Sequence, residues 1–373
     1  MMNANARIPR NKSTTPVQPG LPLARIIVPL GRGSVNVTAA LVGLLMLGVG
    51  GCSTVGFYAQ AAAGQASLMF ARRDAGDVIA DPLSDPEVVR KLRLVAEMLR
   101  YAEDELHLPV GGRYRSYVEI DGALMWSVVA APEFSIEAIP RCYPVIGCAV
   151  YRGYFARTRA AREAERLGVS HDVMVAEVAA YSTLGWFDDP VLSSFLGYDE
   201  ASLADLVFHE LAHSVVYVAG DSAFNESFAG FVGNEGALRW LAHSGRDASG
   251  YRQGVESAKA YARFLGEWRH RLGDLYRQPI GDDAKRQLKA ELFAAMHADY
   301  RLQRDRLGGG RYDAAMTEPF NNARMALIST YEDDKPRFAR LFSDLGEDWA
   351  AFYDAVKELA ALPKDQRWKS IDP

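Results

Sequence analysis

Hydrophobic residues recur along this chain with helical spacing in some stretches and with strand-like alternation in others. Residues 86–106 place Leu92 and Leu99 with other apolar side chains on one side of a helix, and the alanine-rich residues 56–73 are also predicted to be helical. Between residues 114 and 178 the apolar stretches become short, β-branched and aromatic. Helical spacing then returns and continues to the end, so the pattern predicts a mostly helical α+β fold.

Three stretches are predicted to be strands of one small sheet: residues 116–120, 123–131 and 172–184. Each is rich in β-branched or aromatic residues and is bounded by Gly, Pro or Asp. The glycine-containing segments 245–250 and 307–313 are predicted loops. No internal repeat interrupts the chain after residue 51, and we expect one compact domain over residues 52–373.

The first 51 residues have the layout of an export signal. Basic residues come first, an apolar run starts near Val37, and small residues precede Cys52. The apolar run is shorter than the roughly 20 residues that a membrane span needs. Residues 49–52, VGGC, resemble a bacterial lipobox, which implies that a lipidated Cys52 begins the mature chain and attaches it to a membrane. An uncleaved N-terminal anchor is the alternative.

The resemblance to lipoprotein sorting signals also implies a location. Ser53, and not an aspartate, follows the cysteine, which implies the outer membrane of a bacterial cell envelope, facing the periplasm. In such an oxidising compartment, Cys142 and Cys148 are an even pair that favours a disulfide. No nearby histidine completes a metal site with them.

Composition excludes one class of partner. With 373 residues, 49% hydrophobic content and a net charge of -5, the chain can bury a substantial core. It lacks long basic runs and basic stretches interleaved with aromatic residues, so nucleic acid is not an expected partner.

The segment LVFHELAHSVV contains the motif H-E-x-x-H. On a helix, His209 and His213 lie on one face and can direct two imidazole nitrogens at one zinc ion, Zn2+. Glu210 is about 100° further around the helix, which places its carboxylate beside that ion. Zinc with three protein ligands keeps a position for water, and Glu210 could take that water's proton as general base.

A third zinc ligand is expected from the segment that follows. Glu226 and Glu235 each come after an asparagine, but nine residues separate them, so they lie on opposite sides of one helix. We favour Glu226, because its face carries small residues that would allow close approach to the His209 helix, whereas Glu235 lies near bulky side chains. The small residues are Ala223, Ala229, Gly230, Gly233 and Ala237. Gly220 is predicted to stop the first helix, with Asp221 or Ser222 as cap of the second, giving a tight antiparallel pair.

The sequence resembles known families at these motifs. H-E-x-x-H followed by N-E-x-x-A, Asn225 to Ala229, is similar to the glutamate-zincin metallopeptidases. CYPVIGCAVYRGYF, AYSTLGWFDDPVLSSFL, LVFHELAHSVVYVAGDSAFNESFA and NNARMALISTY together resemble the putative aminopeptidase family of bacterial lipoproteins. This resemblance covers nearly everything after Cys52 and implies a zincin-like metallopeptidase domain, in which the H-E-x-x-H helix packs against a second ligand-bearing helix, and aminopeptidase activity on peptide substrates.

The chain departs from related zinc peptidases in two places. Only twelve residues separate His213 from Glu226, fewer than in thermolysin-like enzymes. Position 230, where those enzymes carry an aspartate that orients a zinc histidine, is Gly230 here, which leaves Asp205 as a weak candidate for that role.

Several further roles remain open at this level. The zincin resemblance implies that the 172–184 strand pairs with extended substrate, with Glu177 as one of several candidates to hold its ammonium group. Tyr331, Tyr181 and Tyr217 are candidate oxyanion donors. The alternative function is a catalytically inactive envelope lipoprotein that binds or scaffolds. Complete zinc ligands and an intact Glu210 argue against it. The sequence does not indicate an oligomeric state.

Overall fold

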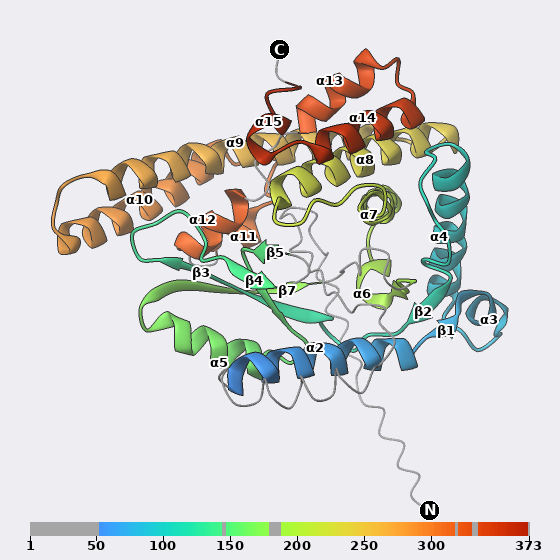
Figure 1. The fold of residues 1–373 in the computed structure, drawn as a ribbon, viewed down its shortest axis with the longest axis horizontal. Helices are drawn as coiled ribbons and strands as arrows, with labels where there is room; N and C mark the ends of the chain where they lie inside the picture. Colours follow the sequence, from blue (N-terminus) through green and yellow to red (C-terminus); the bar gives the residue numbers. More distant parts are fainter. Residues whose placement is uncertain (1–51, 144–146, 179–187, 318–319, 330–334, 372–373) are drawn as a thin grey trace, which may run out of the picture.

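The computed structural model describes residues 52–143, 147–178, 188–317, 320–329 and 335–371. Helices dominate and the strands form small sheets, which confirms the predicted mostly helical α+β fold. In Figure 1, α2 (Cys52–Phe70) and α5 (Arg157–Gly168) lie below the central strands, and most of the other helices lie above them.

The central sheet has the order β6 (Arg152–Tyr154), β3 (Met125–Pro132) and β7 (His171–Val178), all antiparallel. In its register, Ser127 of β3 lies opposite Gly153 of β6 and Ala176 of β7. Among the described strands β7 pairs with β3 alone, so it is an edge strand.

The predicted single sheet is wrong in one respect, because the 116–120 stretch belongs to a different sheet. There β2 (Ser116–Val118) pairs antiparallel with β1 (Arg73–Asp74) and parallel with β8 (Val191–Leu192). Val118 and Leu192 are both buried, so a contact between residues far apart in the sequence decides the pairing. A third sheet, β4 (Arg141–Tyr143) with β5 (Gly147–Ala149), is a short hairpin.

The predicted disulfide is present in that hairpin. Cys142 and Cys148 lie opposite each other in the β4–β5 register, and their Sγ atoms are bonded. Both cysteines are exposed, so the bridge lies at the protein surface.

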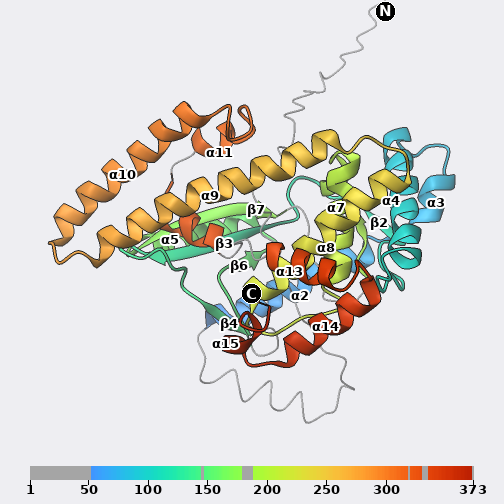
Figure 2. The ribbon, with the colours of Figure 1, turned by 90° about the horizontal axis from the view of Figure 1, so that it is seen from above.

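The predicted helix at residues 86–106 is α4 (Pro86–Asp104), and its start follows from Asp85 and Pro86. The Asp85 side chain accepts hydrogen bonds from the backbone N–H groups of Glu87 and Val88, at 2.7 and 3.4 Å. Pro86 occupies the first turn, where its missing N–H costs nothing. Figure 2 shows α9 (Ser249–Arg277) running along most of the molecule with α10 (Asp282–Gln303) folded back beside it. The remaining helices are α3 (Ala75–Ala80), α6 (Ser193–Leu196), α7 (Glu200–Ala212), α8 (Ser222–His243), α11 (Asp313–Thr317), α12 (Asn322–Ser329), α13 (Lys335–Asp344), α14 (Trp349–Ala361) and α15 (Lys364–Arg367).

The main hydrophobic core surrounds α7 and α8. Leu92 of α4, Phe208 of α7, Phe228 of α8 and Phe352 of α14 are all inaccessible to solvent or nearly so. Burial of side chains of this size stabilises the fold by about 1.5–3 kcal/mol each. The helices that carry the H-E-x-x-H and N-E-x-x-A motifs therefore belong to the most firmly packed part of the protein.

None of the helices in the described residues is both long and apolar enough to cross a membrane. Residues 1–51, with the predicted export signal, lie outside the described part of the chain.

Candidate metal centre

The H-E-x-x-H motif lies at the end of α7. Asp199 begins the helix by accepting a hydrogen bond from the Ser202 backbone N–H at 2.9 Å. The helix ends at Ala212, and His213 is the residue that caps it. His209 and His213 are both buried, at 7% and 3% exposure, so burial and helical spacing bring two imidazoles together in the protein interior.

The predicted end of this helix at Gly220 is wrong by about two turns. Beyond His213 the N–H groups of Ser214 and Val215 bond to carbonyls three residues back, which closes the helix in tight turns. Three of the next residues are valines, which lose χ1 freedom in a helix and so favour its end. Gly220 has a φ of +79° and serves the turn before α8 instead.

The irregular segment 214–220 is fastened to α8 by one side chain. Asn225 accepts a hydrogen bond from the Val218 N–H and donates one to the Val218 carbonyl, both at 2.8 Å. Asn225 is buried and precedes Glu226, so the asparagine of the N-E-x-x-A motif fixes the connection between the two helices.

Replacing Asn225 with alanine should destabilise the protein by about 1–3 kcal/mol, because the Val218 N–H and carbonyl lose their partner in a poorly solvated place. Segment 214–220, which follows His213 directly, should also lose this attachment to α8. Chemical unfolding monitored by circular dichroism measures the first effect. Asn234→Ala, on the same helix, removes one hydrogen bond to Tyr251 and leaves the segment in place. Equal loss of stability in both variants would contradict this role for Asn225.

Helix α8 approaches α7 through two glycines. A Cβ at Gly233 would lie 2.7 Å from the Asp205 carbonyl oxygen and 3.0 Å from the His209 Cβ, and one at Gly236 would lie 2.9 Å from the Phe208 ring. The predicted small-residue contact is therefore present at Gly233. Gly230 does not take part, since it faces Lys335 of α13. The helices cross steeply and are not aligned as an antiparallel pair, because α7 is seen end-on in Figure 1 while α8 runs across the view.

The close approach brings three predicted ligands together. The Nε2 atoms of His209 and His213 are 3.1 Å apart. Glu226 directs Oε2 at His209 Nε2, at 3.4 Å, and Oε1 at His213 Nε2, at 3.7 Å. Oε2 is buried and receives no hydrogen bond from the described residues. One oxygen and two nitrogens within 4.8 Å of one another form a group that could hold a metal ion.

The two remaining acidic candidates lie in different surroundings. Glu210 follows His209 on α7 and is 3% exposed. Glu235 instead faces away from the cluster and forms an ion pair with Arg239 at 2.7 Å, in a half-exposed position. The structure thus separates the two glutamates of α8 as the small-residue argument predicted, with Glu226 alone beside the histidines.

Comparison with known proteins adds the family. A family model described as putative aminopeptidase matches residues 56–371, which is most of the sequence. The chain belongs to the putative aminopeptidase family. Neither the curated proteins nor the solved structures contain a match to it. Membership in the putative aminopeptidase family indicates hydrolysis of peptides.

For a member of the putative aminopeptidase family, Tyr217 is the described candidate for an oxyanion donor, since Tyr181 and Tyr331 lie outside the described residues. Tyr217 belongs to the segment that Asn225 fastens. Burial raises the pKa of its phenol to about 12, and the negative charge of Glu226 adds to the shift. The phenol therefore keeps its proton at neutral pH and can donate a hydrogen bond.

Asp205 lies one helical turn before His209, at the crossing with Gly233. It shares a hydrogen bond with Tyr251, whose hydroxyl also accepts one from Asn234. Burial, with the charge of Asp205 as a second cause, holds the pKa of Tyr251 well above its usual range. Asp205 is thus part of a polar group that joins α7, α8 and α9 behind the cluster.

Arg367 and Lys364 were not predicted from the sequence to lie near the start of α8. Arg367 of α15 is buried and forms an ion pair with Asp221, which immediately precedes α8. Asp221 is the N-cap residue of α8, as one of the two capping predictions has it, but its side chain makes no capping hydrogen bond. Lys364 adds a second, exposed positive charge 3.6 Å from the same carboxylate. An isolated arginine near the end of a sequence carries no signal of such a partner.

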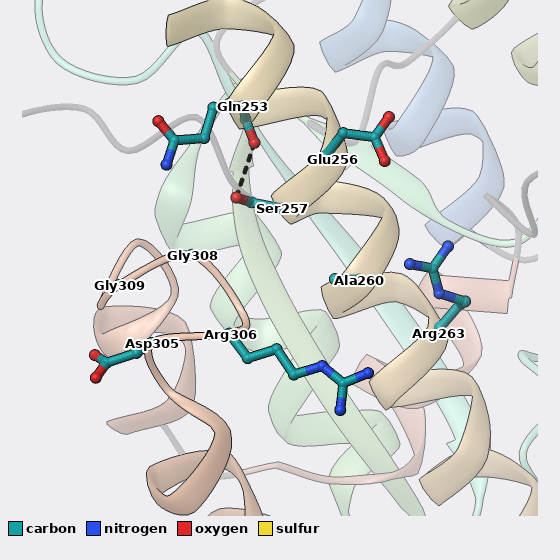
Figure 3. A pocket seen from close by; sticks show the side chains of 9 residues that line it. All are labelled: Gln253, Glu256, Ser257, Ala260, Arg263, Asp305, Arg306, Gly308 and Gly309. Atoms are coloured by element: carbon teal, nitrogen blue, oxygen red, sulfur yellow. Dashed lines mark hydrogen bonds between the residues drawn. The ribbon is translucent and has the colours of Figure 1, made fainter.

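A hollow lies between α9 and the loop after α10 (Figure 3). In Figure 3 its lining carries charges of both signs, and the Ser257 hydroxyl donates to the Gln253 carbonyl at 2.8 Å. None of the predicted site residues lines it. The lining residues are Gln253, Glu256, Ser257, Ala260, Arg263, Asp305, Arg306, Gly308 and Gly309.

Proposed function

We propose that this member of the putative aminopeptidase family is a zinc-dependent aminopeptidase that uses Glu210 as its general base. The observation that carries the proposal is the buried cluster of His209, His213 and Glu226, with Glu210 next to it on α7. A protein without this chemistry has no need to bury Glu226 beside two imidazoles and Glu210 next to one of them in the sequence, because burial of a carboxylate is costly.

The donor set fits zinc in kind and in spacing. Two imidazole nitrogens and one carboxylate oxygen are the ligands of many catalytic zinc sites. Zinc bonds of about 2.0–2.1 Å at tetrahedral angles place neighbouring ligand atoms about 3.3–3.4 Å apart. The separations here are 3.1, 3.4 and 3.7 Å.

In this proposal His209, His213 and Glu226 hold the ion, and Glu210 transfers the proton. A bound zinc ion would lower the pKa of a water molecule and polarise a carbonyl group. Glu210 would take a proton from that water and later give it to the departing amine.

Substrate would bind along β7 in the same proposal. The edge position of β7 leaves backbone groups on one side for pairing with an extended peptide. Glu177 lies near the end of this strand and is exposed, so it stays a candidate for the substrate ammonium group. Tyr217 is our preferred oxyanion donor among the described tyrosines.

We further propose that the mature protein is attached to the outer membrane by a lipid on Cys52 and faces the periplasm. The Cys142–Cys148 disulfide supports an oxidising compartment. Acyl labelling of the chain and of Cys52→Ala in bacteria would test the anchor.

Metal analysis and a paired peptide panel test the function. The purified chain should contain about one zinc per molecule, lose it to a chelator, and regain activity when zinc is restored. It should release the first residue from peptides with a free amino terminus and leave their N-acetylated versions intact. Cleavage of acetylated or internally quenched peptides at internal bonds would replace the aminopeptidase assignment with an endopeptidase. A chain that binds no metal and cleaves nothing would support the scaffolding alternative.

A further inference from the structure

The N-terminal helix α2 presents an outward surface without charge. None of its 19 residues is Asp, Glu, Lys or Arg. Its exposed residues form one stripe, which we name the α2 outer face: Tyr58, Ala59, Ala62, Ala63, Ala66, Ser67, Met69 and Phe70. Phe70 is 90% exposed and Tyr58 is 42% exposed. A helix on the outside of a protein in water normally carries charged or polar residues on that side.

The opposite side of α2 is firmly attached, so this exposure is not a result of loose docking. Gln60 is buried and donates to the Gly153 carbonyl at 3.2 Å, and it accepts from the Phe155 N–H at 3.0 Å. It therefore completes the backbone hydrogen bonds of the edge strand β6. A Cβ at Gly64 would overlap the Phe155 ring, so the helix lies as close as glycine allows.

Helix α5, next to α2, carries exposed positive charge. In Figure 1, α5 shares the lower layer with α2, and Arg159 of α5 donates to the Gly56 carbonyl near the start of α2, at 3.3 Å. Arg157 and Arg162 are exposed and form no ion pair within the described residues. Val169, directly after α5, is 88% exposed.

The position of Cys52 decides what covers this surface. Helix α2 begins at Cys52, so the predicted lipid would be attached to the first turn of the helix, without a flexible linker. A lipid inserted there holds the start of α2 at the membrane surface. Uncharged and aromatic side chains on a helix then fit the boundary between headgroups and acyl chains, and flanking arginines fit lipid phosphates.

We propose that the α2 outer face, with Arg157 and Arg162 of α5, lies on an anionic lipid bilayer. This inference goes beyond the proposed peptidase and rests on the predicted lipid at Cys52. The layer of α7 and α8 is on the other side of the central sheet in Figure 1, so the metal cluster faces away from the membrane.

Fluorescent probes on the full lipidated chain in vesicles test the contact. An environment-sensitive dye would be attached through Ala62→Cys on the α2 outer face, or through Gln253→Cys in the hollow of Figure 3 as the matched control. Without reductant, the Cys142–Cys148 disulfide does not react, and the chain with no added cysteine measures background labelling. Vesicles of phosphatidylethanolamine with phosphatidylglycerol would be compared with vesicles of phosphatidylcholine alone, each with and without a lipid-borne quencher.

The Ala62 probe should shift to the blue and lose about half or more of its emission to the quencher, because an interfacial helix lies roughly 5–10 Å into the headgroup boundary. The Gln253 probe should change little. Arg157→Glu with Arg162→Glu should weaken the quenching in the anionic vesicles and leave it unchanged in phosphatidylcholine.

Equal responses of the Ala62 and Gln253 probes would overturn the proposal and leave the lipid as the sole membrane contact. Equal quenching in the anionic vesicles with and without the changes Arg157→Glu and Arg162→Glu would overturn the preference for anionic lipid. Mass spectrometry that finds no lipid on Cys52 would remove the basis of the inference, whereas the zinc and peptide assays would be unaffected. Failure of the peptidase proposal and failure of the membrane proposal are thus distinguishable.

Discussion

Glu210→Gln should bind as much zinc as the unaltered chain and hydrolyse peptides at least about 10²-fold more slowly. Glutamine has nearly the same shape and remains polar, so the buried position at 3% exposure keeps its packing. It cannot accept a proton at neutral pH, however. The loss should appear in kcat with little change in KM, because a base acts in the transition state.

Zinc content measured beside kcat separates this effect from a damaged site. A variant that loses zinc together with activity would show that Glu210 is a ligand or that the fold has changed. Activity within a few-fold of the unaltered chain would contradict its role as the base.

Glu226→Ala should weaken zinc binding by at least about 10²-fold, more than the 10–100-fold typical of residues that only orient ligands. Its carboxylate supplies the oxygens that lie 3.4 and 3.7 Å from the two histidine nitrogens. Two imidazoles alone hold the ion poorly. Titration with a competing chromophoric chelator measures the affinity, and activity should be lost with the metal.

Glu235→Ala is the matched control on the same helix. It removes an ion pair with Arg239 in a half-exposed position, so stability should change by about 0.5 kcal/mol or less and zinc content should not change. Loss of metal from the Glu235 variant and not from the Glu226 variant would reverse the ligand assignment.

Local pattern was sufficient for the elements whose residues interact with near neighbours. The Asp85–Pro86 start of α4 and the spacing of His209 and His213 on α7 both depend on contacts within one or two turns. Small residues also indicated which side of α8 meets α7, because close approach requires them, as at Gly233. The distinction between Glu226 and Glu235 follows from that side.

The remainder depends on contacts that sequence spacing does not encode. Gly230 and Gly233 are equally small, but only the fold shows that Gly230 meets Lys335 of α13 and not α7. The end of α7 at Ala212 was missed because Gly220 is a strong stop signal, whereas the valines before it are weak ones. Pairing of β2 with β8 likewise joins residues more than 70 positions apart.

The ion pair of Asp221 with Arg367 implies that the start of α8 is completed only after the end of the chain has been made. The two residues are 146 positions apart in the sequence, and all three cluster residues lie between or just before them. During synthesis or export, the histidines and Glu226 emerge long before Arg367 can neutralise the carboxylate at the start of α8. A chain held partway through a translocation channel would therefore have the side chains of all three proposed zinc ligands. The helix α8 that carries Glu226 would still lack the ion pair at its start. If the chain is exported and binds zinc as we propose, loading of the metal should follow complete passage of the chain into the periplasm.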